Sequence, residues 1–180
     1  MLRAEALATR IFKVADGVVT MNDRVSFPAR AMFGVIGLSP ESGHVSTFPG
    51  TSRRQHGRSD ERRRRHGEIS GTGVEIGGTA LIKVGVIKSK RSGWPITETA
   101  DAFYTHATSQ SSIDDALRGA GEEASRLLVD GWDFSSEDAF MFFSVAGDLG
   151  IAAYYQPSPG TATARMRVPK LASNPAPFRL

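Results

Sequence analysis

The chain has 180 residues, which is enough for one domain or two small ones with a hydrophobic core. Of these residues 40% are hydrophobic and 23% are charged, a composition typical of globular proteins. It contains no cysteine, which excludes disulfides, thiolate nucleophiles, iron–sulfur clusters and cysteine-based zinc sites, and leaves His, Asp and Glu as metal ligands. The formal charge is +3, but residues 53–65 hold seven arginines against Asp60 and Glu61, so the basic character belongs to one segment.

This arginine-rich segment is expected to form a solvated, mobile loop over residues 51–65, because its like charges repel and it has no apolar anchor. No Phe, Tyr or Trp occurs between Pro49 and Gly93, so the stacking platforms of a nucleic-acid interface are missing and we expect no nucleic-acid partner. The sequence shows no signal peptide, and it has no apolar run of the roughly 18 residues that a membrane-spanning helix requires. We therefore expect a cytoplasmic protein without membrane contact.

The first half of the chain has the pattern of β-structure. Residues 10–20 are rich in β-branched types around Asp16-Gly17, which predicts a hairpin. Residues 31–38 form a short apolar stretch with two glycines, which indicates a buried strand or a tight β-turn region. Residues 79–88 alternate in the period-two pattern of a strand with at least one buried face.

The second half has two helical patterns, over residues 113–130 and 136–146, with N-caps at Ser112 and Ser135 and a stop at Gly131. The predicted inner face of the first helix consists of Ile113, Ala116, Leu117, Ala120, Ala124, Leu127 and Leu128. The predicted outer face consists of Asp114, Asp115, Glu122, Glu123 and Arg126. The second helix repeats Ala139, Phe140, Phe143 and Ala146 at helical spacing.

Two further strands, 151–156 and 164–168, are predicted on either side of a proline-rich turn at 157–160. We expect the helices to pack against the strands near 80–87 and 151–156. The expected fold is mainly β, with a sandwich-like β-rich domain over residues 1–90 and an α+β domain with two helices over residues 91–180.

Residues 66–76 carry the most informative polar pattern. Small residues there let a backbone approach a ligand closely, while Glu68 and Glu75 offer carboxylates for acid-base chemistry or metal binding. A glycine-rich turn with surface glutamates explains the same pattern. The motifs of esterases, P-loop proteins and zincin proteases are absent from the sequence.

Four blocks resemble the acetamidase/formamidase family in that family's order. They are FGVIGLSPESGHVSTFPG from Phe33, HGEISGTGVEIGGTALIKVGVIK from His66, GWPITETADAFYTHAT from Gly93 and SSEDAFMFFSVAGDLGIAAYY from Ser135. The resemblance implies a sandwich-like body followed by a smaller α+β part. It also implies a hydrolase that cleaves the C–N bond of small linear amides such as formamide or acetamide and assembles as a homo-oligomer.

The chain departs from the family's pattern between the first two blocks. His56-Gly57-Arg58-Ser59-Asp60 stands where a His-Gly-Gly-Asn-x-Asp string is usual, and a later Gly-Asp-x-His string is missing. The resemblance assigns Glu68 and Asp60 to catalysis, and His56, Asp60 and Glu68 to a divalent metal, zinc or calcium, that is weakly bound or lost. Three functions stay open: an active amidase, an impaired or non-catalytic folded remnant, and a binding module that uses the arginine-rich segment.

Overall fold

The computed structural model describes residues 8–29, 36–37, 42–43, 56–57, 66–68, 73–86, 88, 92–155 and 161–170. Backbone contacts divide the chain into two compact units: Met1–Met32 with Gly73–Gly77, and Phe33–Thr72 with Gly78–Leu180. The predicted domain boundary near residue 90 stays a prediction. No helix in this described part of the chain is long and apolar enough to cross a membrane.

The first unit contains a three-stranded antiparallel sheet of β1 (Lys13–Ala15), β2 (Val18–Asn22) and β3 (Val25–Pro28). The turn between β1 and β2 is Asp16-Gly17, whose φ angles of 50° and 75° suit a two-residue hairpin turn. The predicted hairpin is therefore confirmed. The third strand was not predicted from the sequence.

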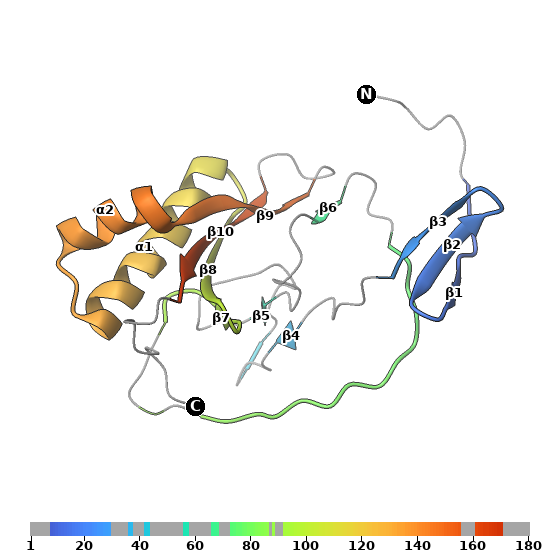
Figure 1. Ribbon diagram of the computed structural model, residues 1–180, viewed down its shortest axis with the longest axis horizontal. Coiled ribbons are helices and arrows are strands. Elements are labelled where there is room, and N and C mark those ends of the chain that lie inside the picture. The colour runs from blue at the N-terminus through green and yellow to red at the C-terminus, as the bar shows by residue number, and fades with distance from the viewer. Residues whose placement is uncertain are drawn as a thin grey trace. The chain divides into compact units, whose positions relative to one another are not determined.

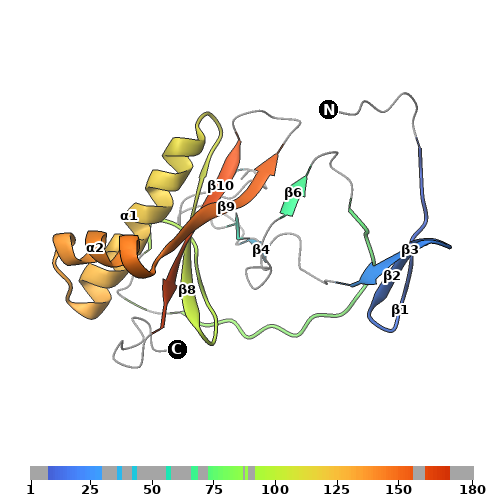
Figure 2. The same cartoon turned by 45° about the horizontal axis from the view of Figure 1, so that its top comes forward.

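The second unit is built on a five-stranded sheet with the order β6-β9-β10-β8-β7 (Figures 1 and 2). Its strands are β6 (His66–Glu68), β7 (Ile96–Glu98), β8 (Ala102–Ser109), β9 (Asp148–Tyr155) and β10 (Ala162–Pro169). Neighbouring strands run antiparallel, except that β6 at one edge runs parallel to β9. The predicted strands at 151–156 and 164–168 are thus confirmed as β9 and β10. The long strand β8 was not predicted.

A separate two-stranded pair joins β4 (Ile36–Gly37) to β5 (His56–Gly57). The strand predicted over 31–38 is thus seen only at its β4 residues, and its remainder lies outside the described residues. The predicted arginine-rich loop at 51–65, β5 apart, and the predicted turn at 157–160 also lie outside them.

Both predicted helices are confirmed, as α1 (Ile113–Trp132) and α2 (Ser136–Ala146). Each begins at a serine cap, because Ser112 Oγ accepts from the Asp115 N–H at 3.3 Å and Ser135 Oγ accepts from the Asp138 N–H at 3.0 Å. The first helix does not stop at Gly131 as predicted. It continues to a C-cap at Asp133, which adopts a left-handed φ of 60°, a conformation that aspartate tolerates better than most residues.

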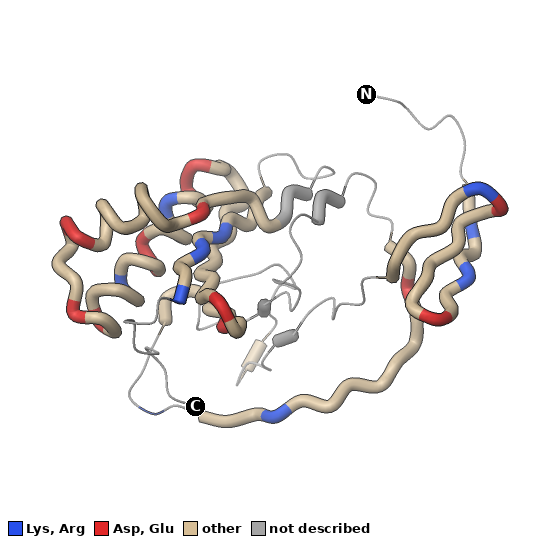
Figure 3. Tube along the Cα trace, viewed as in Figure 1, with Lys and Arg blue, Asp and Glu red and all other residues tan. Residues whose placement is uncertain are grey.

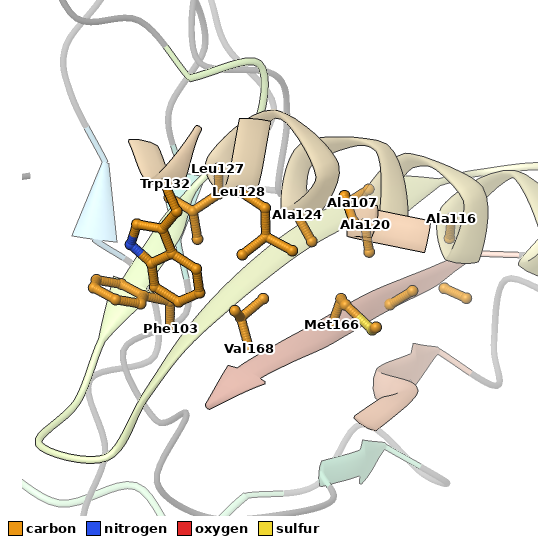
Figure 4. Close-up of a cluster of buried hydrophobic side chains, with 13 residues drawn as sticks. Phe103, Ala107, Ala116, Ala120, Ala124, Leu127, Leu128, Trp132, Met166 and Val168 are labelled. Atoms are coloured by element: carbon orange, nitrogen blue, oxygen red, sulfur yellow. The ribbon is translucent and has the colours of Figure 1, made fainter. Parts of the chain in front are cut away.

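The core lies between α1 and the strands β8 and β10, as Figure 4 shows. Three of the four largest side chains that are fully buried here, Phe103, Leu128 and Val168, come from β8, α1 and β10. Trp132 closes one end of the cluster, with its ring 6.3 Å from that of Phe103. The apolar face predicted for α1 therefore packs on β10 and on β8, a strand that the sequence analysis missed and that lies beside β10 in the sheet.

Two residues lie on the opposite side of their helix from the one predicted. Glu123 was assigned to the outer face of α1 but is 2% exposed, because it accepts hydrogen bonds from the Gly93 N–H at 3.0 Å. Phe140 was grouped with Ala139, Phe143 and Ala146 in the helical repeat that predicts an apolar face for α2, but it is 75% exposed. Phe142 takes that inner position instead, with its ring 6.5 Å from Trp132.

The strand predicted over residues 79–88 is wrong for the residues that the structure describes there. Residues 79–86 belong to no strand, and their side chains are exposed. An alternating sequence makes a strand possible, but the strand forms only when a neighbour accepts its backbone hydrogen bonds. No described residue pairs with this segment. The helices pack against β8, β9 and β10. Residues 80–86, part of the segment that was expected to pack against them, have exposed side chains.

Candidate functional site

Glu68, the predicted catalytic carboxylate, lies on the edge strand β6 of the five-stranded sheet. The parallel register places Glu68 beside Tyr155 and His66 beside Ala153 of β9. Only three residues of β6 take part in this pairing. The structure thus gives the His-Gly-Glu string a defined backbone position at one edge of the sheet.

The other predicted site residues are not brought to that edge by strand pairing. His56 lies on β5, in the separate two-stranded pair, opposite Gly37. Asp60 lies outside the described residues. Among the side chains that the structure describes, no three His, Asp or Glu residues gather closely enough to hold a metal ion. The metal set of His56, Asp60 and Glu68 therefore stays a prediction.

A second polar region, which we call the polar sheet face, lies on the side of the five-stranded sheet turned away from the helices. It follows from strand alternation: Ala164, Met166 and Val168 of β10 enter the core, so the residues between them point to the other side. Register pairs the two arginines of β10 with two polar residues of β8. The described members are Tyr104, His106, Thr108, Asp148, Thr163, Arg165 and Arg167.

The polar sheet face is held together by direct contacts. The Thr108 and Thr163 hydroxyl oxygens are 2.8 Å apart, and the Arg165 guanidinium lies over the Tyr104 ring at 5.5 Å. Tyr104 and His106 are 8% and 6% exposed, although neither faces the helix core. These side chains are therefore buried on a face whose chemistry is polar and cationic.

Acidic residues at the β7–β8 turn balance part of this charge, and Figure 3 shows them in red near the basic positions of β10. Arg167 donates to Asp101 at 3.0 Å, and Lys170 donates to Glu98. The hydrogen bond from Thr99, at 2.8 Å, and then that from Arg167 hold the pKa of Asp101 below its usual value. The same pairing raises the pKa of Arg167 further above its already high value.

The sequence analysis missed the polar sheet face. The signal was present in Thr163-Ala164-Arg165-Met166-Arg167, where apolar and basic residues alternate along a predicted strand. Alternation places both arginines on the face opposite the core. Their neighbours Tyr104 and His106 could not be found in this way, because they come from the strand that was not predicted.

A loop next to β7 is fixed by the buried carboxylate of Glu123. Both Glu123 oxygens accept from the Gly93 N–H at 3.0 Å, and Arg126 donates to the same carboxylate at 2.8 Å. The Pro95 carbonyl then accepts from the His106 N–H at 3.2 Å. The segment that leads into β7 is thus tied to α1 and to β8. This arrangement supports one edge of the sheet.

The fold resembles three solved structures. A recombinant predicted acetamidase/formamidase from Thermoanaerobacter tengcongensis superposes with a TM-score of 0.73 and 26% identity, over 88% of this chain and 59% of that chain. An acetamidase from Bacillus halodurans gives 0.69 and 24%, over 88% and 60%, and one from Yersinia enterocolitica gives 0.70 and 21%, over 88% and 54%. The last two likenesses show the fold alone.

The chain therefore spans between 54% and 60% of the length of these structures. No protein-family model matches the sequence, and no curated protein matches it either.

Proposed function

Because the chain has the acetamidase/formamidase fold that its sequence blocks predicted, we propose that it hydrolyses the C–N bond of small linear amides such as formamide or acetamide. One observation carries the proposal: 88% of this chain superposes on the T. tengcongensis structure with a TM-score of 0.73. Fold alone does not fix chemistry, so the assignment also rests on the sequence block that contains Glu68.

Glu68 is the proposed acid-base residue. Its carboxylate takes a proton from water as the water oxygen bonds to the amide carbon, and the C–N bond breaks as that proton passes to the departing nitrogen. The net reaction converts the amide and one water into ammonia and a carboxylic acid. His56 and Asp60 are its proposed partners. Together with Glu68 they would hold a zinc or calcium ion, which would polarise the amide carbonyl.

We further propose that turnover is low compared with proteins that carry the missing Gly-Asp-x-His string. Unactivated amides resist hydrolysis, and a carboxylate acting alone is a weak base. A positioned acid-base group contributes about 10²- to 10⁴-fold when its partners are in place. The loss of an Asp and a His removes partners of this kind from the chain.

The test is ammonia release from formamide and from acetamide, with and without added zinc or calcium. We expect slow release of ammonia, matched by an equal amount of formate or acetate. No ammonia above the buffer level under any of these conditions would overturn the proposal. Two alternatives would then remain: a non-catalytic fold, and a module that binds an acidic partner through residues 53–65. Polyphosphate binding that weakens steeply as the salt concentration rises would identify the binding module.

The cytoplasmic location and the homo-oligomeric state expected from the sequence belong to the same proposal. The oligomeric state is measured by light scattering on the chain that is used for the assay. A monomer that still hydrolyses amides would remove oligomerisation from the proposal without touching the chemistry.

A further inference from the structure

Arg165 and Arg167 of β10, and Lys170 directly after this strand, differ in their partners. Arg167 donates to Asp101 at 3.0 Å, and Lys170 donates to Glu98, so both side chains have a carboxylate at hydrogen-bond distance. The nearest carboxylate oxygen to Arg165 belongs to Asp148 and is 3.8 Å away, which is too far for a hydrogen bond. Arg165 is therefore the one of the three that lacks a close acceptor in the described part of the chain.

Arg165 is also the most buried of these three side chains, at 11% exposed against 25% for each of the others. A guanidinium carries five N–H donors, and burying them without acceptors costs free energy. Tyr104 contributes its ring face at 5.5 Å, which stabilises the cation but accepts no N–H in line. Arg165 is thus a cation backed by an aromatic ring, and no described residue accepts a close hydrogen bond from its guanidinium.

We infer that Arg165 and Tyr104 form a binding site on the polar sheet face for a small monocarboxylate, of the size of formate or acetate. A carboxylate is planar and presents two oxygens, which match two N–H groups of a guanidinium in a bidentate pair. We infer a small ligand because the arginine side chain is only 11% exposed. Asp148, 3.8 Å from Arg165, opposes a second negative charge and so favours monoanions over dianions.

This site is separate from Glu68. Arg165 pairs with Gly150 of β9, whereas Glu68 pairs with Tyr155 of the same strand. Two strand spacings across the sheet and five residues along it put the two α-carbons about 20 Å apart. The inference rests on the contacts of Arg165 and does not depend on amide hydrolysis.

The experiment titrates the folded full chain with sodium acetate and sodium formate against sodium chloride of equal ionic strength. The readout is the arginine Nε–Hε resonance of Arg165 in a ¹H–¹⁵N spectrum, assigned by its disappearance in Arg165→Lys. We expect a saturable shift with acetate and formate, a weaker response to succinate, and no saturation with chloride.

The Arg165→Lys variant lacks this resonance, so its acetate binding is measured by saturation transfer to the acetate methyl group. We expect its affinity for acetate to fall by about tenfold or more, because lysine keeps the positive charge but lacks the two parallel N–H donors of a guanidinium.

Arg118→Lys is the matched control. Arg118 also lies 3.8 Å from an aspartate oxygen, that of Asp115, but is 69% exposed, so its substitution leaves acetate binding unchanged. Asp148→Asn removes the opposing carboxylate and tightens acetate binding. This variant keeps the inference testable if Arg165→Lys fails to fold. Three results would overturn the inference. They are the absence of a saturable shift with acetate, an equal shift with chloride, and an acetate affinity that stays the same in both Arg165→Lys and Asp148→Asn. Acetate binding without ammonia release would uphold this site and reject the proposed hydrolase.

Discussion

At the scale of single residues, Glu123 has a large structural role for a charged residue. Its carboxylate is 2% exposed and joins the Gly93 backbone to Arg126 on the next turn of α1. A buried carboxylate is tolerated when hydrogen bonds and an opposite charge replace the lost water. The helical spacing of the sequence predicted that Glu123 faces solvent. Spacing alone cannot show that the segment at Gly93 packs against this part of the helix.

Glu123→Ala is expected to lower the free energy of unfolding by about 2 kcal/mol, because it leaves the Gly93 N–H without its acceptor and removes the partner of Arg126. Urea denaturation measures this difference. Glu122→Ala, at the exposed neighbouring position, is the control and is expected to change stability by less than about 0.5 kcal/mol. Equal stabilities of the two variants would contradict the role given to Glu123.

Asp101 gives a prediction for pH. Its folded pKa lies below the unfolded value, first because of Thr99 and then because of Arg167, so its contribution to stability is complete above about pH 4. That contribution is lost as the pH falls through the lower folded pKa. A carboxyl-carbon NMR titration should show a midpoint below the usual value. Thr99→Val should raise this midpoint more than Arg167→Gln does, and Thr99→Ser should leave it unchanged.

At the scale of elements, the contact between α1 and β8 can be tested with two glycines of the same helix. A Cβ at Gly119 would come within 2.8 Å of the Ala107 Cβ, whereas a Cβ at Gly121 would meet nothing within 4 Å. Gly119→Ala is therefore expected to destabilise the protein by about 1 to 3 kcal/mol through overpacking. Gly121→Ala is expected to stabilise it by about 0.5 to 1 kcal/mol, because alanine favours the helix. Stabilisation by both substitutions in a thermal melt would refute the packing described for this interface.

Local sequence signals predicted the helices, their serine caps, the first hairpin and the pair β9 and β10, because each depends on residues close together in the chain. The strand β8 was missed for a physical reason. Thr105, on its core face, donates to the Ala120 carbonyl at 2.7 Å, and this buried polar residue interrupts the apolar alternation that marks a strand. Residues 79–86 show the converse, since they have the alternation and lack a described partner strand.

At the scale of the whole molecule, four short sequence blocks predicted the family resemblance and the mainly β fold class that the solved structures confirm. The candidate site could be predicted only as residue types. Glu68 reaches its edge position through parallel pairing with β9, and Arg165 meets Tyr104 through pairing with β8. Both pairings join segments far apart in the sequence, so spacing along the chain does not reveal them.

The central claim is that Glu68 carries hydrolysis of small amides, and the most direct test compares Glu68→Gln with Glu75→Gln in an ammonia-release assay on formamide. Glutamine keeps the size of the side chain and cannot accept the proton. We expect Glu68→Gln to lower the rate by about 100-fold or to the buffer level, while Glu75→Gln, at an exposed position, retains the parental rate. Ammonia release from Glu68→Gln at the parental rate, with a melting temperature equal to that of the parent, would contradict the claim.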